Sequence, residues 1–189
     1  GGWCPTTTDV HQEGIIFSHN KLYEGGVLNN ELHRFILKNV RNPEAVDGDL
    51  NAKIAACQTG VKRYLELCDR YSAEIVEQAL MEVMNQSEER MRGEIRNFPN
   101  GTYHAETYLD NDGIRLDQPC KISVDVTVED EILKIDWSGS DPATLGPVNH
   151  PMVGTKALCG TVMKYLTMPN DPTNDGHLRP LVVTAPQNT

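Results

Sequence analysis

Two polar turns in the C-terminal part of the sequence carry the residue types best suited to binding a substrate. Asn149 and His150 come directly before an apolar segment, and Asn174 and Arg179 belong to the second turn, residues 174–180. An arginine guanidinium presents a planar fork that suits a carboxylate or a phosphate. The free amides at the start of a helix favour an anionic oxygen and can stabilise a developing oxyanion. We therefore expect these four side chains to line a substrate site.

Each of these residues also has a purely structural interpretation. Asn149 can cap the following helix, and Arg179 can tie its turn to a nearby carboxylate such as Asp175, or to backbone carbonyls. His150 and His177 flank a helix whose ends lie roughly 22 Å apart, so they do not share a metal unless the chain folds back. Turn chemistry of this kind is common, and both interpretations stay open at this point.

Elsewhere the sequence offers little that could hold a metal or a nucleotide. His11 and Glu13 could converge on a metal in an extended chain, but a catalytic zinc site typically uses about three protein ligands. A solvated polar loop is therefore the favoured interpretation. The sequence contains no Walker-type glycine loop, G-x-G-x-x-G, H-E-x-x-H or G-x-S-x-G. We assign no catalytic residue, cofactor-binding residue or metal ligand.

The front of the chain is rich in helical patterns. We expect helices over residues 30–39, from Asp47 or Asp49 to residue 71, and from residue 72 to about residue 95. The middle helix carries an apolar stripe with alternating spacings of three and four, formed by Leu50, Ile54, Cys57, Val61, Leu65 and Cys68. Gly60 within it suggests close packing, since glycine otherwise weakens a helix. The two long helices should pack as an antiparallel hairpin.

Beyond residue 99 the apolar period changes to two, which indicates strands. Strands are expected at residues 102–109, 120–128 and 133–137, with Asn111-Asp112-Gly113 as a hairpin-type turn. A helix at 152–166 and a short buried strand at 181–183 follow. The predicted fold class is α+β, a helical hairpin beside an antiparallel meander. We place a helix-rich segment at 1–98 and a strand-rich segment at 99–189, as one continuous domain of a larger protein.

Composition limits the partners. The formal charge is −10 and the pI is about 5.0, which disfavours nucleic acid and anionic membrane surfaces. No apolar run reaches transmembrane length. The five cysteines are scattered without C-x-x-C, as expected for small core residues in a reducing compartment, so we favour the cytoplasm. The chain starts Gly-Gly and stops straight after a strand-like run, which suggests a piece of a larger subunit.

Seven short stretches, taken in order, resemble one known family. Three lie around the polar turns: D-W-S-G-S at 136–140, G-P-V-N-H-P at 146–151 and N-D-G-H-L-R-P at 174–180. The four earlier stretches are residues 13–26, 39–44, 48–56 and 98–103. Together they resemble the hydantoinase B/oxoprolinase family, which includes N-methylhydantoinase B subunits, the second half of 5-oxoprolinase, and alpha-type subunits of acetone and acetophenone carboxylases.

The resemblance implies an ATP-dependent enzyme that opens a cyclic amide such as hydantoin, 5-oxoproline or a lactam through a phosphorylated substrate. ATP and Mg would be held by a hydantoinase A-type subunit or domain, in a hetero-oligomer. A divalent metal, Zn or Mn, would belong to the full subunit, with its ligands upstream of Gly1, so the isolated chain should be inactive. Two alternatives remain: an alpha-type subunit of an ATP-dependent ketone carboxylase, and a non-catalytic scaffold segment.

Overall fold

The computed structural model describes residues 4–186 and divides into two compact units, Gly1–Val76 and Glu77–Thr189. The division falls inside helix α3 (Ala73–Ile95), whereas the change from helix to strand comes later, between Ile95 and Gly101. The predicted division at residue 98 therefore corresponds to the change from helix to strand. That this position is also a domain boundary stays a prediction.

The first unit consists of short elements followed by two helices. A 3-10 turn η1 (Val10–Gln12) precedes the small hairpin of β1 (Tyr23–Glu24) and β2 (Val27–Leu28). Helix α1 (Asn30–Lys38) begins at a cap in which the Asn29 side chain accepts a hydrogen bond from the Leu32 amide at 3.1 Å. The predicted helix at 30–39 is thus confirmed to within a residue.

Helix α2 (Pro43–Tyr71) begins earlier than the sequence pattern predicted. The side chain of Asn42 accepts a hydrogen bond from the Ala45 amide at 3.2 Å, and Pro43 occupies the first turn, where its fixed φ suits a helix and its missing amide costs nothing. The start at Asp47 or Asp49 was wrong because the proline that ends one helix also begins the next.

The apolar stripe of α2 is largely open in this structure. Val61 and Leu65 are exposed, and a Cβ at Gly60 would meet no atom within 4 Å. The inference of close packing at Gly60 was therefore wrong for the described residues. Because α2 and most of α3 belong to different compact units, their predicted antiparallel packing stays a prediction.

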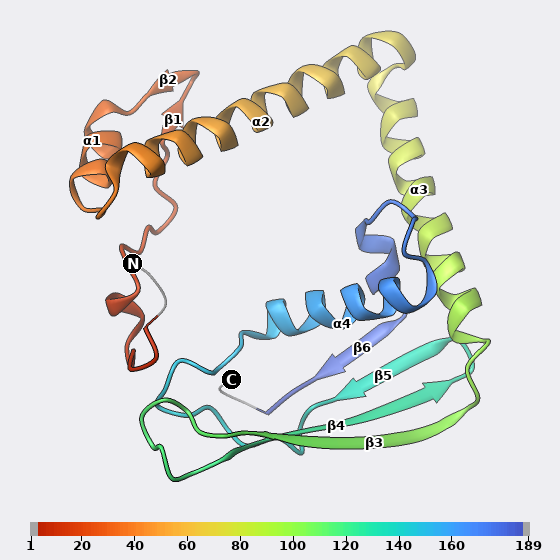
Figure 1. Ribbon diagram of the computed structural model, residues 1–189. Coiled ribbons are helices and arrows are strands. Elements are labelled where there is room, and N and C mark those ends of the chain that lie inside the picture. The colour runs from red at the N-terminus through yellow and green to blue at the C-terminus, as the bar shows by residue number, and fades with distance from the viewer. Residues whose placement is uncertain (1–3, 187–189) are drawn as a thin grey trace. The chain divides into compact units, whose positions relative to one another are not determined.

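The second unit is built on a four-stranded sheet in the order β3-β4-β5-β6 (Figure 1). Its strands are β3 (Gly101–Leu109), β4 (Cys120–Glu129), β5 (Ile132–Asp136) and β6 (Leu181–Thr184). The first three pair antiparallel and form the predicted meander, while β6 pairs parallel to β5. A parallel neighbour requires a crossover connection, and helix α4 (Met152–Thr167) provides it. The α+β fold class is confirmed.

One face of this sheet carries the core. Leu133, Ile135 and Val183 of the sheet pack with Cys159 and Met163 of α4, and the end of α3 adds two further side chains, Met91 and Ile95. Helix α4 lies along the sheet beside β6 (Figure 1). The opposite face is polar, because successive residues of a strand point to opposite sides.

The connection between β3 and β4 is longer than the tight hairpin that Asn111-Asp112-Gly113 suggested. Leu109 pairs with Cys120, so residues 110–119 all lie in the loop. The buried Asp112 carboxylate organises that loop by accepting hydrogen bonds from the amides of Arg115 (2.6 Å) and Ile114 (2.8 Å), which hold its pKa below the usual value. The turn chemistry was recognised correctly, but a buried carboxylate stabilises a wide loop instead of a two-residue turn.

Candidate functional site

A cavity of about 960 Å³ opens on the apolar face of the sheet, between the strands and α4. Its floor is aliphatic and comes mainly from alternate residues of β4, namely Ile122, Val124, Val126 and Val128. Its wall comes from α4, with Leu158, Val162 and Leu166. Polar side chains gather in the connection between β5 and α4 and at the start of α4: Ser140, Asp141, Thr144, Asn149, His150 and Thr155. An apolar pocket with a few polar groups is the usual form of a small-molecule site.

The segment after β5 is held in place by side chains of the D-W-S-G-S stretch. Asp136 accepts hydrogen bonds from the Ser138 amide and the Thr184 hydroxyl, which lower its pKa and join the end of β5 to β6. The hydroxyl of Ser140 donates to the Ser123 carbonyl and accepts from the Ser123 amide, both at 2.9 Å. These bonds fix the segment across β4 and so shape the polar part of the cavity.

Asn149 closes the loop that leads into α4. Its side-chain oxygen accepts a hydrogen bond from the Thr144 amide at 2.8 Å, and its side-chain nitrogen donates to the carbonyls of Thr144 (2.8 Å) and Gly146 (3.0 Å). The residue at the helix cap is Pro151, which makes no side-chain cap bond. The capping interpretation of Asn149 was therefore wrong, although its observed role is also structural.

Gly146 lets this loop approach the β3–β4 connection. A Cβ at this position would lie 1.7 Å from the carbonyl oxygen of Asp112, which no side chain tolerates. The glycine of G-P-V-N-H-P thus brings two loops together beside the cavity.

His150 lies on the cavity wall at the start of α4. Its Nδ1 and the Thr155 hydroxyl are 3.2 Å apart, and its ring lies over Gly154, where a Cβ would come 2.4 Å from Cε1. The ring is therefore held through Nδ1, while Nε2 has no hydrogen-bond partner among the residues described.

Asn174 lies away from the cavity and supports the turn itself. Its side-chain oxygen accepts a hydrogen bond from the Gly176 amide at 2.9 Å, at the start of the 3-10 turn η2 (Asp175–Leu178). Its side-chain nitrogen donates to the Ser87 hydroxyl of α3 at 2.7 Å. The N-D-G stretch thus attaches the turn to α3.

Arg179 also faces α3. Its Nη1 donates to Asn85 Oδ1 and to the Glu88 carboxylate, both at 3.0 Å. The structural interpretation of Arg179 was right in kind, but the carboxylate is Glu88 and not Asp175. The sequence could not predict the pair of Arg179 and Glu88, because the two residues are far apart in the chain.

The four candidates therefore do not form one site. Asn149 and His150 line the cavity, whereas Asn174 and Arg179 bond to α3 and are absent from the cavity wall. Sequence reasoning missed Asp141 and Thr155, which also line the cavity. A signal for both was present, because each lies within a few residues of D-W-S-G-S or G-P-V-N-H-P.

A resident metal does not fit the part of the chain described. No group of three or more His, Cys, Asp or Glu side chains among residues 4–186 is placed to hold one. His11, one of the two weak candidates, belongs to η1, where its amide donates to Asp9 Oδ1 at 2.8 Å. Nor does any helix in the same range combine the length and apolar character needed to cross a membrane.

Comparison with known proteins gives the family. The sequence profile of the hydantoinase B/oxoprolinase family matches residues 1–189. A putative D-/L-hydantoinase B-type subunit from Pseudomonas sp. (strain NS671) is 35% identical over 96% of this chain. The chain therefore belongs to the hydantoinase B/oxoprolinase family.

Two solved structures share the fold. The crystal structure of ATP-dependent caprolactamase from Pseudomonas jessenii has a TM-score of 0.83 at 25% identity and covers 95% of this chain. The nucleotide-free structure of acetone carboxylase has a TM-score of 0.85 at 17% identity over 94% of this chain, which is a likeness of fold alone. The chain spans 32% of the length of the hydantoinase relative and 31% of the caprolactamase chain. It therefore corresponds to about a third of such a subunit.

Proposed function

We propose that this chain is a segment of the B-type subunit of an ATP-dependent hydrolase that opens cyclic amides. The observation that carries the proposal is the match of the whole chain to the hydantoinase B/oxoprolinase family. The names of two relatives, a hydantoinase subunit and a caprolactamase, point to hydantoins and lactams as the substrate class. A small ring with an apolar edge and an amide also suits the polar end of the cavity, where aliphatic side chains meet Asn149 and His150.

ATP and Mg belong, in this proposal, to a hydantoinase A-type partner subunit or domain that phosphorylates the substrate. The sequence itself lacks a phosphate-binding glycine loop. The B-type subunit then completes the reaction in a cytoplasmic hetero-oligomer. No step is assigned to a metal here, since the described residues do not form a metal site.

Within this segment we assign substrate contact to His150 and positioning to the other three candidates. His150 lies on the cavity wall and has one ring nitrogen without a hydrogen bond among residues 4–186. Asn149 sets the loop that carries it. Asn174 and Arg179 hold the turn after α4 against α3, so they act on the site only through the placement of that turn.

The reaction class is tested by measuring ATP hydrolysis of the native complex with two substrate sets. One set contains hydantoins, 5-oxoproline and lactams, and the other contains ketones with bicarbonate. Stimulation by cyclic amides is expected. Stimulation by ketone plus bicarbonate alone would instead assign the chain to the carboxylases, for which the shared fold of acetone carboxylase is the supporting observation. No stimulation by either set would favour a scaffold segment.

The role of His150 is tested by His150→Ala in the same complex. Loss of one hydrogen bond to the substrate costs about 1 kcal/mol, so the KM for the cyclic amide should rise about fivefold, with assembly unchanged. His104→Ala is the matched control, because His104 is an exposed histidine on β3 that is absent from the cavity wall. Unchanged KM and kcat in His150→Ala would remove His150 from the site.

A further inference from the structure

The apolar face of the sheet is covered over only part of its width. Residues of β3 that point to the same side as the core are exposed, with Tyr103 at 50% and Leu109 at 38%. Across the cavity, α4 exposes Leu158 at 55%, Val162 at 55% and Leu166 at 71%. We call these five side chains, together with the aliphatic floor from β4, the sheet groove. A contiguous apolar surface of this kind marks an interaction site.

The dimensions of the groove suit one helix. Four strands spaced about 4.8 Å apart make a sheet roughly 15–20 Å wide, and a helix with its side chains is about 10–12 Å across. Helix α4 packs on the β5 and β6 side through Cys159 and Met163, so about one helix width remains over β3 and β4. The nine residues of β3 span about 30 Å, which a helix of about 20 residues matches in length.

We propose that the sheet groove is filled by an amphipathic helix from the part of the same subunit that lies outside these residues. About two thirds of the hydantoinase and caprolactamase relatives lies outside the matched region. A sheet that buries one whole face under two adjacent helices is a standard two-layer arrangement. Such a helix would be apolar toward Val124 and Val126 and polar on its outer side. It would fill the aliphatic part of the cavity and leave its polar end, at Asn149 and His150, for a substrate.

The proposal rests on membership of the family and not on the reaction. An assay of ATP hydrolysis therefore does not test the helix proposal. If the helix proposal proved wrong, the cyclic-amide proposal would be unaffected. A second copy of this chain is the rival occupant. It is the less favoured one, because two identical concave grooves do not fill each other in a symmetric pair.

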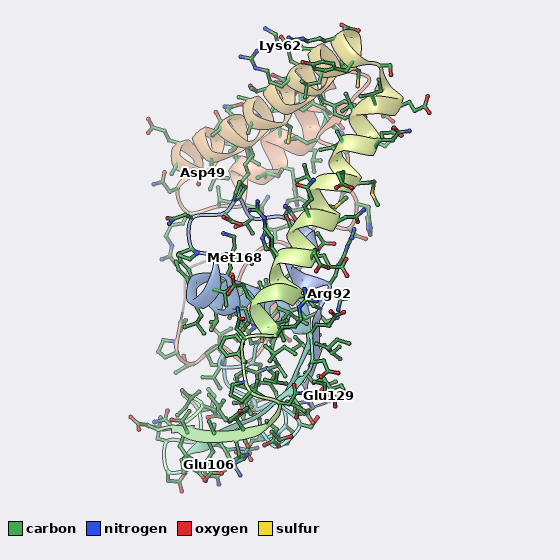
Figure 2. The ribbon with its side chains drawn as sticks, turned by 90° about the vertical axis from the view of Figure 1, so that its right-hand side faces the viewer. Asp49, Lys62, Arg92, Glu106, Glu129 and Met168 are labelled. Carbon is green, nitrogen blue, oxygen red and sulfur yellow. The ribbon has the colours of Figure 1, made fainter. Side chains whose placement is uncertain are left out.

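Photo-crosslinking in the complete subunit tests the proposal. Leu158 is replaced by benzoylphenylalanine in the full reading frame that contains these residues, and the crosslinked peptides are identified by mass spectrometry. We expect a crosslink within one subunit, to a single apolar segment outside residues 1–189. The matched control places the same group at Glu106, which lies on the face of the sheet opposite α4 (Figure 2); it should not reach that segment.

A second readout guards against a photochemical failure. In the complete subunit, a cysteine introduced as Leu158→Cys should react with a maleimide at least about tenfold more slowly than one introduced as Glu106→Cys, since reaction would require local opening. Equal rates would overturn the proposal. So would a crosslinked product at twice the subunit mass, or a crosslink to a different polypeptide.

Discussion

Gly176 gives the sharpest test of how the turn after α4 is attached to α3. A Cβ at this position would lie 2.1 Å from the carbonyl oxygen of Met84 and 2.9 Å from Asn174 Oδ1. The first of these atoms belongs to the backbone of a helix, so no side-chain rotation relieves the contact. In Gly176→Ala either η2 or α3 must move, and any movement stretches the hydrogen bond from Asn174 to Ser87.

The magnitude follows from two opposing effects. Overpacking of this kind costs about 1–3 kcal/mol, and weakening one partly buried hydrogen bond adds about 1 kcal/mol. In the opposite direction, alanine lowers the conformational entropy of the unfolded chain, which raises the free energy of unfolding by about 0.4–1 kcal/mol. We expect Gly176→Ala to lower the free energy of unfolding of the second unit by about 1–3.6 kcal/mol.

The assay is denaturant unfolding followed by the fluorescence of Trp137, in a Trp3→Phe background so that one tryptophan reports. Gly93→Ala is the matched control because Gly93 lies in α3 itself, where its Cβ would meet only Arg96 Nη2 at 3.8 Å. Replacing this glycine of a helix interior by alanine should raise the free energy of unfolding by up to about 1 kcal/mol. If Gly176→Ala were as stable as Gly93→Ala, the close approach of the turn to α3 would be refuted.

Three further predictions concern individual bonds. Hydrogen bonds from Arg92 and Arg179 hold the pKa of Glu88 below its usual value, so its contribution to stability is present above about pH 4.3 and is lost as pH falls through the lowered pKa. The stability difference between the native protein and Glu88→Gln, measured by unfolding at several pH values, should therefore shrink on acidification; a difference independent of pH would contradict this. The hydrogen bond to Asp125 raises the pKa of His104, so its NMR titration midpoint should lie above about 6.5 and fall in Asp125→Asn, whereas an unshifted midpoint would exclude the pairing. Asn149→Ala removes the acceptor of the Thr144 amide, and hydrogen exchange of that amide should quicken while exchange in β4 stays as before.

The local elements followed from the sequence because their causes are local. The cap at Asn29, the alternating strands from residue 101 to 136 and the helix from Met152 all appear where the pattern predicted them. Helix α2 was misplaced at its start for an equally local reason, since Pro43 suits the first turn of a helix but the predicted helix began only at Asp47 or Asp49. The family resemblance likewise depends on short ordered motifs and needed no structure.

The candidate site depended on contacts that spacing does not reveal. The polar turns were found in the sequence, but the two ends of α4 face different surroundings. His150 lies at the cavity, whereas Arg179 pairs with Glu88 on a helix far earlier in the chain. Which carboxylate an arginine meets is decided by the packing of α3 against the rest of its unit.

The sequence by itself determined the element types, the turn chemistry and the family, because periodicity, caps and motif order are properties of neighbouring residues. Only the tertiary structure decided that Asp112 meets Gly146, that Gly176 meets Met84, and that an apolar half of the sheet lies open beside α4. Each of these depends on chain segments that are distant in sequence. Their contact is fixed by shape and burial in three dimensions, which no local pattern encodes.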